Sequence, residues 1–332
     1  MKKRKIGRIN KEVSAIGMGC FAIGGPFYRS TGGVLAYGQV DDEESIKAIH
    51  KAIDMGVNVF DTADIYGVGR SEKVLGKALK DYRDDIVIAT KFASRFEEGN
   101  PISLAGKGTS TEYIRRAIRD SFRRLQTDFI DIYQFHSSDY PIEESIKVRN
   151  TLDDLVQEGL IGSFGWSTDD VERAKFFAES NNCVAIQYAL NLTHHNRLMI
   201  KFCEEENLSG LIRSPFASGT LTGKYGPDTK IQDDHMLSRL DFSDERRRKI
   251  LSKLQDLKEI LTEDGRSLIQ GQLSWILAQS KTIIPIPGAK NVKQIKENAG
   301  TLELEPLKSD VVDKINELFQ EFITEGVLKS SL

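Results

Sequence analysis

Short apolar runs alternate with amphipathic stretches of helical periodicity along almost the whole chain, and this alternation restricts the fold more than any other feature. The apolar runs predict strands at 16–18, 57–60, 86–90, 129–135, 160–166, 184–188, 209–214 and 282–286. The amphipathic stretches predict helices at 42–55, 71–80 (opened by Ser71), 111–125, 142–158, 170–180, 196–206, 266–280 and 291–299. Repeated strand–helix units form a parallel sheet covered by helices, and eight such units close a barrel. We therefore expect an α/β fold, specifically a (β/α)8 TIM barrel.

Three segments are additional to the eight units. Residues 5–15 are expected to form an N-terminal hairpin across the bottom of the barrel. Residues 216–263 form a long loop/helix insertion after the seventh strand, with a helix at 243–262, and an insertion of this length is usually a functional lid. An extra C-terminal helix is expected at 308–321. Because no linker interrupts the pattern, residues 1–332 are expected to form a single barrel domain.

The composition argues against several classes of function. The formal net charge is −3, with no basic excess and no cationic amphipathic stretch, so neither nucleic acid nor a membrane surface is an expected partner. No apolar run reaches the roughly 18 residues that a transmembrane helix needs. Cys20, Cys183 and Cys203 are odd in number and lack CxxC spacing, which favours reduced thiols in a cytoplasmic protein. The sequence defines no oligomeric state.

Ionisable side chains follow three successive predicted strands. Asp61 comes directly after the second strand with Tyr66 five residues later, Lys91 follows the third strand, and His136 follows the fourth. The C-terminal ends of parallel barrel strands form one rim, so these four side chains can converge. Each residue alone is more typical of a turn, a packing contact or a salt-bridged strand end. Their occurrence together on consecutive strands favours a functional site.

This combination of side chains can protonate a carbonyl oxygen. An ammonium beside a phenol favours the phenolate, so Lys91 is expected to lower the pKa of Tyr66, while Asp61 holds Lys91 charged and in place. His136 can hydrogen-bond a substrate oxygen that gains negative charge while another group attacks the carbon. No Ser-His-Asp arrangement is present, and Asp61 and His136 lack further ligands at metal-binding spacing, so no metal is expected.

Three segments stand out together: residues 56–67 (GVNVFDTADIYG), Thr90-Lys91-Phe92 and Gln134-Phe135-His136. They resemble the three hallmark blocks of the aldo-keto reductase family. The resemblance runs from about residue 5 to residue 300. It implies that Tyr66 is the general acid, that Asp61 and Lys91 tune it, and that His136 positions the carbonyl. It also implies NADP(H) bound without a GxGxxG motif, and the reversible reduction of a small aldehyde or ketone by hydride transfer.

The same resemblance implies a set of cofactor contacts. Ser167 and Gln187 would hold the nicotinamide carboxamide, with Thr168 in place of the Asn that the family has beside the serine. Arg213 stands where the family often has an aromatic ring on the nicotinamide, and its charge would oppose the positive oxidised ring. The other expected contacts are Cys20, Phe21, Asp61, Ser214, Pro215, Phe216, Ser218, Leu221, Lys224, Arg239, Gly288, Lys290, Gln294, Glu297 and Asn298.

Lys290 opens the final block, where backbone amides at a helix N-terminus favour a phosphate. It is the expected partner of the phosphate that distinguishes NADP from NAD, and the less favoured alternative is a solvated lysine at a helix entry. The substrate side is less defined by the sequence. Its candidate apolar wall, which could equally be packing, consists of Cys20, Phe21, Phe27, Tyr28, Phe92 and Trp166.

Two other classes of function remain open at the level of sequence. One is a cofactor-sensing regulatory subunit resembling the potassium channel β subunits, whose pattern usually has Asn in place of His136. The other is an unrelated barrel lyase or isomerase in which Lys91 forms a Schiff base. The block at 286–298, which resembles an adenine-binding segment, argues against the second class.

Overall fold

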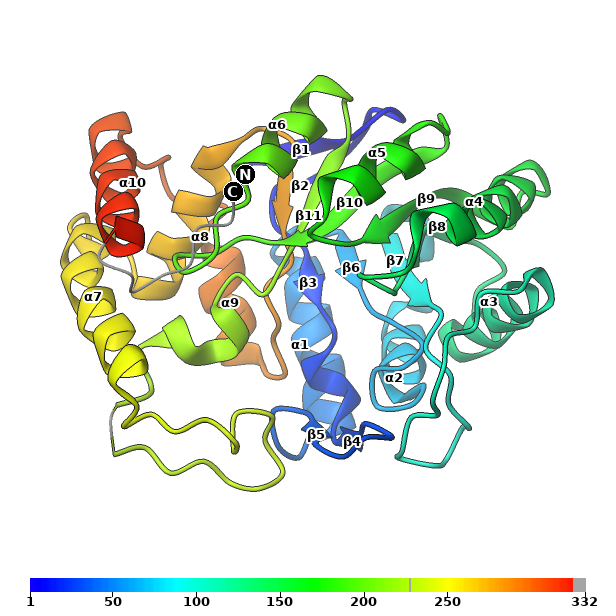
Figure 1. The fold of residues 1–332 in the computed structure, drawn as a ribbon, viewed down its shortest axis with the longest axis horizontal. Coiled ribbons are helices and arrows are strands. Elements are labelled where there is room, and N and C mark those ends of the chain that lie inside the picture. Colours follow the sequence, from blue (N-terminus) through cyan, green and yellow to red (C-terminus); the bar gives the residue numbers. More distant parts are fainter. Residues whose placement is uncertain (227, 325–332) are drawn as a thin grey trace.

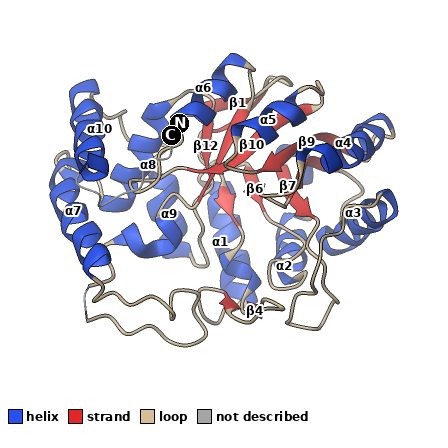
Figure 2. Ribbon diagram, in the orientation of Figure 1, coloured by secondary structure: helices blue, strands red, loops and turns tan. Residues whose placement is uncertain are grey.

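Eight parallel strands form the centre of the molecule (Figures 1 and 2). The computed structural model describes residues 1–226 and 228–324. The strands lie in the order β12-β11-β10-β9-β8-β7-β6-β3. The sheet closes because Gly17 N and Gly19 N donate to Pro285 O and Pro287 O, at 2.9 and 3.0 Å. The expected barrel is therefore confirmed, with strands at β3 (Met18–Gly19), β6 (Val59–Asp61), β7 (Val87–Phe92), β8 (Ile130–Phe135), β9 (Ile161–Ser167), β10 (Cys183–Ala189), β11 (Ser209–Arg213) and β12 (Ile283–Pro285).

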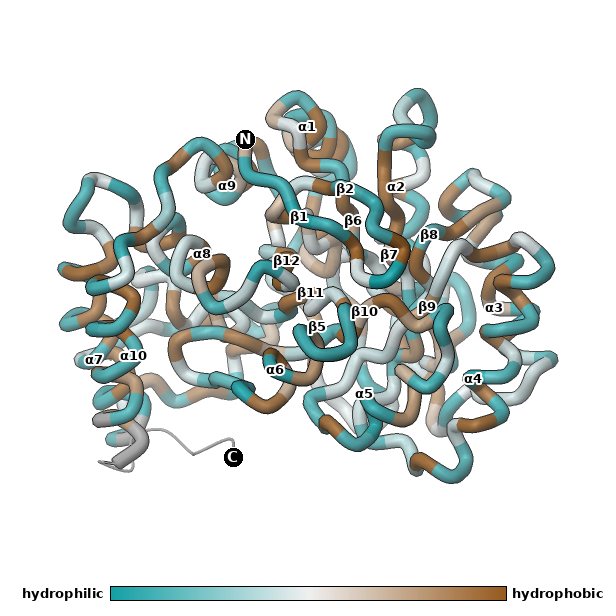
Figure 3. The backbone as a smooth tube through the Cα atoms, turned by 90° about the horizontal axis from the view of Figure 1, so that it is seen from above, coloured by the Kyte–Doolittle hydropathy of each residue, from teal (hydrophilic) through white to brown (hydrophobic). Residues whose placement is uncertain are grey.

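Helices surround the strands, and Figure 3 shows hydrophilic and hydrophobic residues alternating along them. They are α1 (Asp42–Asp54), α2 (Arg70–Leu79), α3 (Thr111–Leu125), α4 (Ile142–Gln157), α5 (Val171–Ala178), α6 (Arg197–Glu205), α8 (Leu268–Gln279) and α9 (Val292–Gly300). Asp41, Ser110, Asp170 and Asn196 cap their helices by accepting a hydrogen bond from the first turn. The prediction that Ser71 opens α2 was wrong, because the helix begins at Arg70 and the Ser71 hydroxyl donates to Cys20 O at 2.7 Å.

Most of the buried apolar residues belong to two layers. One cluster fills the barrel interior and consists of Ile6, Val13, Val59, Val87, Ala89, Ile132, Val184, Ala185, Leu211, Ile284 and Ile286. A larger cluster lies between the strands and the helices. The interior is thus packed with aliphatic side chains, and polar groups concentrate at the C-terminal rim.

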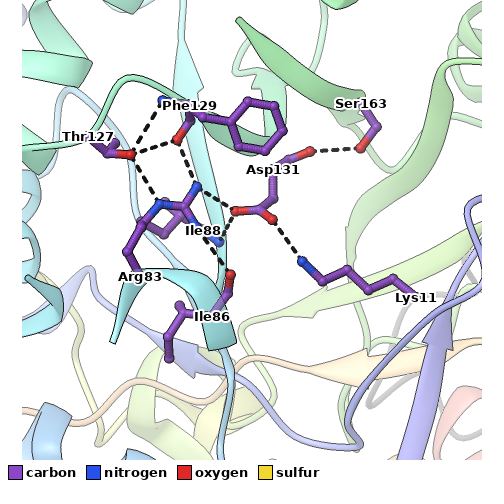
Figure 4. A network of polar contacts seen from close by, with 8 residues as sticks. All are labelled: Lys11, Arg83, Ile86, Ile88, Thr127, Phe129, Asp131 and Ser163. Atoms are coloured by element: carbon purple, nitrogen blue, oxygen red, sulfur yellow. Dashed lines mark hydrogen bonds and ion pairs between the residues drawn. The ribbon is translucent and has the colours of Figure 1, made fainter. Parts of the chain in front are cut away.

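The predicted N-terminal hairpin is present as β1 (Lys3–Ile6) and β2 (Lys11–Ser14), which pair antiparallel. Its residues Ile6 and Val13 belong to the interior cluster and close the bottom of the barrel. Asp131 on β8 fixes this end, because its carboxylate accepts hydrogen bonds from Arg83, Ile88 N and Lys11 at 2.8, 3.0 and 3.1 Å (Figure 4).

Further elements lie at the two ends of the barrel and outside it. They are β4 (Phe27–Tyr28), β5 (Val34–Leu35), α7 (Glu245–Thr262), α10 (Ser309–Thr324), and three short 3-10 helices, η1 (Ala22–Gly24), η2 (Arg83–Asp85) and η3 (Ala217–Thr222). The insertion before α7 reaches the β4–β5 hairpin at the lower edge of Figure 1, where Met236 N donates to Ala36 O at 2.8 Å. In the described part of the chain no helix has the length and apolar content needed to cross a membrane.

Candidate active site

The four ionisable residues predicted from the sequence converge at one point of the rim. Asp61 ends β6, Lys91 lies near the end of β7, and His136 follows β8. Lys91 Nζ donates to Asp61 Oδ1 at 2.5 Å, to Thr62 O at 2.7 Å and to Tyr66 Oη at 3.2 Å. The Tyr66 and His136 rings meet edge to face, with their centroids 5.9 Å apart. One ammonium group therefore joins the carboxylate and the phenol.

The turn after β6 directs Tyr66 to this point. Gly67 has a positive φ of 59°, and a Cβ at this position would collide with the Gly24 carbonyl, so the backbone here requires glycine. The Phe21 ring stands at 90° to the Tyr66 ring with a centroid distance of 5.0 Å. The phenol is thus fixed between the η1 loop on one side and Lys91 on the other.

Lys91 is charged although it is completely buried. Burial on its own lowers the pKa of this ammonium, but the charge of Asp61 and the hydrogen bonds to Asp61 and Tyr66 outweigh it, so the pKa is raised. The second oxygen of Asp61 accepts hydrogen bonds from Gln134 Nε2 and Gln187 Nε2, at 2.9 and 2.8 Å. The carboxylate is therefore satisfied on both sides, and the lysine is held in one position.

The pKa of Tyr66 differs in direction from the sequence-based expectation. Burial raises this pKa and the charge of Lys91 lowers it. Burial has the larger effect, so the pKa lies above the ordinary value of 10.0 and the phenol is protonated at neutral pH. Burial also lowers the pKa of His136 well below 6.5, with further lowering by the positive charges of Lys91, Lys107 and Arg213. Nδ1 of His136 is buried and has no hydrogen-bond partner among the described residues. At neutral pH the site therefore contains a protonated phenol, a neutral imidazole and an ammonium.

A second polar cluster lies between β7 and the helices α2 and α3. Glu72 on α2 accepts hydrogen bonds from Thr90 Oγ1 at 2.6 Å and from Arg124 Nε at 2.7 Å, and all three residues are buried. This cluster connects Thr90, the residue before Lys91, to α2 and α3.

Gln134 also contributes to the site, and the sequence reasoning missed its role. Gln134 stands two residues before His136, at the end of an extended segment, and this spacing was the signal that both side chains lie on one face.

A cavity of about 980 Å³ opens above the four residues, and Tyr66 and His136 line it. The predicted cofactor contacts that line this cavity are Phe21, Asp61, Ser167, Gln187, Arg213, Ser214, Pro215, Phe216, Ser218, Lys224, Gly288, Lys290 and Gln294. They come from strands and loops on every side of the rim. A phenol with a charged lysine behind it thus faces a space large enough for a dinucleotide and a small substrate.

Comparison with known proteins agrees with this geometry. The model of the aldo/keto reductase family matches residues 15–320. The chain belongs to the aldo-keto reductase family. It is therefore related to oxidoreductases, and the family expected from the sequence is confirmed.

Individual relatives of this aldo-keto reductase cover nearly the whole chain. An aldo-keto reductase of Schizosaccharomyces pombe, named for NADP(+), is 30% identical over 95% of this chain and 90% of its own. A probable voltage-gated potassium channel subunit beta of Oryza sativa is also 30% identical, over 96% of this chain and 97% of its own. The solved holo form of an aldo-keto reductase from Bacillus halodurans is 28% identical, covers 96% of both chains and has a TM-score of 0.77.

The cavity of this family member has features that fit a phosphate-bearing cofactor. A Cβ at Gly288 would meet only Gly19 O, at 3.8 Å, so the backbone there is open to a ligand. Lys290 lines the cavity, and burial together with the nearby charge of Lys224 lowers its pKa despite the opposing effect of Asp234. Its Nζ donates to Tyr37 O at 2.7 Å and to Gln39 O at 3.3 Å. Two ammonium groups close together in a pocket favour an anionic ligand.

Arg213 is not the isolated charge that the sequence suggested. Its guanidinium forms an ion pair with Asp169, which also accepts a hydrogen bond from Ala189 N at 2.8 Å. The carboxylate offsets the charge that would otherwise face the nicotinamide position. Thr168, which replaces an expected amide contact, is buried and donates its hydroxyl to Ser138 O at 2.9 Å.

Five of the predicted cofactor contacts do not line the cavity, and they are Cys20, Leu221, Arg239, Glu297 and Asn298. Cys20 and Leu221 are buried in the core. Asn298 lies behind the wall and donates to Gly288 O at 3.4 Å. Glu297 is half-buried on α9, and the Arg239 guanidinium lies against Gly33.

Of the proposed apolar wall, Phe21 and Phe27 line the cavity, whereas Phe92 and Trp166 are buried in the aromatic core and Tyr28 is exposed on the hairpin. In the described residues no group of three His, Cys, Asp or Glu side chains is arranged to hold a metal ion.

Proposed function

We propose that this protein catalyses the NADPH-dependent reduction of an aldehyde or ketone, and the reverse oxidation of the alcohol, with Tyr66 as the general acid. The observation that carries the proposal is the hydrogen bond from the charged Lys91 to the phenol oxygen at 3.2 Å, at the wall of the cavity. A phenol in this setting can give its proton to a carbonyl oxygen, because Lys91 stabilises the phenolate that remains.

Each of the other residues has a separate role in this proposal. Asp61 keeps Lys91 charged and oriented through the 2.5 Å ion pair. His136 is neutral, so it can hydrogen-bond the carbonyl oxygen without competing with Tyr66 as an acid. The raised pKa of Tyr66 keeps the phenol protonated at neutral pH, the form that can give a proton to the carbonyl oxygen.

Ser167 and Gln187 would hold the nicotinamide end of the cofactor, and Lys224 and Lys290 would hold its phosphates. NADPH, when bound, supplies the hydride that reaches the carbonyl carbon. Gln187 already contacts Asp61, so its amide is fixed beside the proton donor. The chain's own contribution is therefore orientation and the transfer of one proton.

A cofactor-sensing regulatory subunit is the second candidate, and the similarity to the potassium channel subunit of rice is the observation in its favour. The complete set of Asp61, Tyr66, Lys91 and His136 favours catalysis. The two proposals differ in one outcome. A regulatory subunit would bind NADPH but leave a broad panel of carbonyl compounds unreduced.

The test measures NADPH binding and NADPH consumption with a panel of aliphatic and aromatic aldehydes and ketones. We expect binding and turnover of at least one aldehyde class, with NADPH preferred over NADH. Binding without turnover would support the regulatory candidate. Absence of binding to any nicotinamide cofactor would refute both proposals and favour a barrel lyase that uses Lys91.

A further inference from the structure

The charges around the cavity are strongly unbalanced. Six cationic side chains line it, and they are Arg29, Arg95, Lys107, Arg213, Lys224 and Lys290. Among the described lining residues Asp61 is the only acid, and Lys91 already neutralises it. Asp169 neutralises Arg213, and Lys224 and Lys290 lie at the proposed phosphate end of the cofactor. Arg29, Arg95 and Lys107 remain without an assigned anion.

Arg95 and Lys107 lie on the loop that follows β7, the strand of Lys91. The backbones of Ser94 and Lys107 form an isolated antiparallel bridge across this loop, and Leu104 N donates a hydrogen bond to Arg95 O at 2.7 Å. Arg95 also donates through Nη1 to Ala105 O at 3.2 Å. The positive charge of Lys107 contributes to the lowered pKa of His136, behind the larger effects of burial and Lys91. The loop therefore brings positive charge close to the proposed reaction centre.

Arg29 reaches the same wall from the β4–β5 hairpin. Tyr28 N donates to Pro101 O at 2.7 Å and Ser103 N donates to Tyr28 O at 2.8 Å, so hydrogen bonds join the hairpin to the loop of Arg95 and Lys107. Ser30 N adds a contact to Ser103 Oγ at 3.2 Å. Two segments that are far apart in the sequence thus present their cations on one side of the cavity.

Several cations on the neighbouring helices α2 and α3 do have acidic partners. Glu98 pairs with Lys73 and Arg123, and Arg115 pairs with Glu158. By contrast, within residues 1–226 and 228–324 no carboxylate lies within ion-pair distance of Arg29, Arg95 or Lys107. A chain with 49 acidic and 46 basic residues has enough carboxylates to pair them. Together with Lys224 and Lys290, these three give the cavity wall five cationic side chains that no described carboxylate pairs.

We infer that the substrate is an anionic carbonyl compound, with a carboxylate or phosphate group that Arg29, Arg95 and Lys107 bind. The inference rests on the proposed reductase activity and names the substrate class of the same site. Guanidinium groups bind carboxylate and phosphate through paired hydrogen bonds, and an ammonium adds a point charge. Holding the anion at this wall would direct the carbonyl end of the molecule towards Tyr66 and His136.

The test compares kcat/KM for aldehydes that differ in one charge. The carboxylate arm pairs para-carboxybenzaldehyde with neutral benzaldehyde, because an ionised para-carboxylate hardly changes the electron demand of the ring, and the phosphate arm pairs glycolaldehyde phosphate with glycolaldehyde. We expect kcat/KM about tenfold higher for the anionic member of at least one pair, and the arm that shows it identifies the anion. Added salt should reduce the ratio.

Variants attribute the preference to the three cations. Arg29→Gln, Arg95→Gln and Lys107→Gln should each lower the anionic-to-neutral ratio by about threefold, mainly through KM. Lys314→Gln, which removes an exposed lysine from the outer helix α10, should leave the ratio unchanged. Equal kcat/KM within both pairs, or a ratio that none of the three cavity variants lowers, would overturn the inference.

A binding measurement separates this inference from the proposed function. The affinity of para-(hydroxymethyl)benzoate for the NADPH-loaded protein is compared with the affinity of benzyl alcohol. This measurement needs no turnover. If no aldehyde is reduced but the carboxylate still binds more tightly through the three cations, the reductase proposal fails and the anion site stands. If aldehydes are reduced but the anionic member of neither pair has an advantage, the reductase proposal stands and the anion site fails.

Discussion

Two ion pairs in this protein have the same N–O distance, 2.5 Å, but very different surroundings. The side chains of Lys91 and Asp61 are 0% and 4% exposed, whereas those of Lys3 and Glu12 are 56% and 57% exposed. We predict that the buried pair contributes several times more coupling energy to folding than the exposed pair. The two charges of the buried pair are hardly screened by water, and losing one leaves the other without a counter-charge in the interior.

The magnitudes follow from the contacts of each pair. Lys91→Met keeps the alkyl stem but leaves the Asp61 carboxylate with only the amides of Gln134 and Gln187, and this should cost about 3–5 kcal/mol of stability. Asp61→Asn with Lys91→Met removes both charges, so the double variant should lose about 2–3 kcal/mol less than the sum of the single losses. The cycle of Lys3→Met and Glu12→Gln should give a coupling of about 0.5 kcal/mol or less.

Urea-induced unfolding followed by tryptophan fluorescence measures these values, since both Trp166 and Trp275 are completely buried. Equal coupling energies for the two pairs would refute the argument, because burial is the variable that separates them. A loss of less than about 1 kcal/mol for Lys91→Met would also refute it, since it would mean that Asp61 is stable in the interior without a counter-charge.

Three further predictions concern the site. The kcat/KM for carbonyl reduction should stay constant between pH 6.5 and 10.0, because burial keeps Tyr66 protonated above 10.0 and His136 neutral below 6.5; a fall in rate inside that window would contradict the assignment. Lys290→Ala should raise the Kd of NADPH about tenfold with little change for NADH, measured by fluorescence titration beside Lys314→Ala; equal losses would remove the lysine from phosphate recognition. Asp169→Asn should weaken the binding of NADP+ about threefold more than the binding of NADPH, because Arg213 would lose its counter-charge. Arg213→Tyr should reverse this difference. An unchanged ratio of the two Kd values would argue against contact between Arg213 and the nicotinamide.

Much of the barrel could be predicted because its strands carry continuous apolar runs and its helices a clear periodicity. The predicted ends of α1, α3 and α7 lie within two residues of the observed ones. The β4–β5 hairpin could not be predicted, since two-residue strands in a glycine-rich loop leave no periodic pattern. The contact of Met236 N with Ala36 O joins segments 200 residues apart and depends on tertiary packing alone.

The convergence of Asp61, Tyr66, Lys91 and His136 could be predicted because parallel strands end at one rim. The direction of the Tyr66 pKa shift could not, since it depends on whether burial or the Lys91 charge has the larger effect, and only the structure shows that burial does. The pairing of Arg213 with Asp169 joins the ends of two different strands, and it changes the expected charge beside the nicotinamide position. Cys20 is adjacent to cavity residues in the sequence but turns into the core.

Steady-state NADPH consumption by wild type and Tyr66→Phe tests the central claim most directly, with the best aldehyde of the panel and NADPH affinity measured in parallel. Loss of the phenol hydroxyl should lower kcat about 100-fold or more while the Kd of NADPH stays within about twofold, because the change removes the proton donor and leaves the phosphate contacts intact. A Tyr66→Phe protein that keeps a kcat close to that of wild type would contradict the assignment of Tyr66 as the general acid.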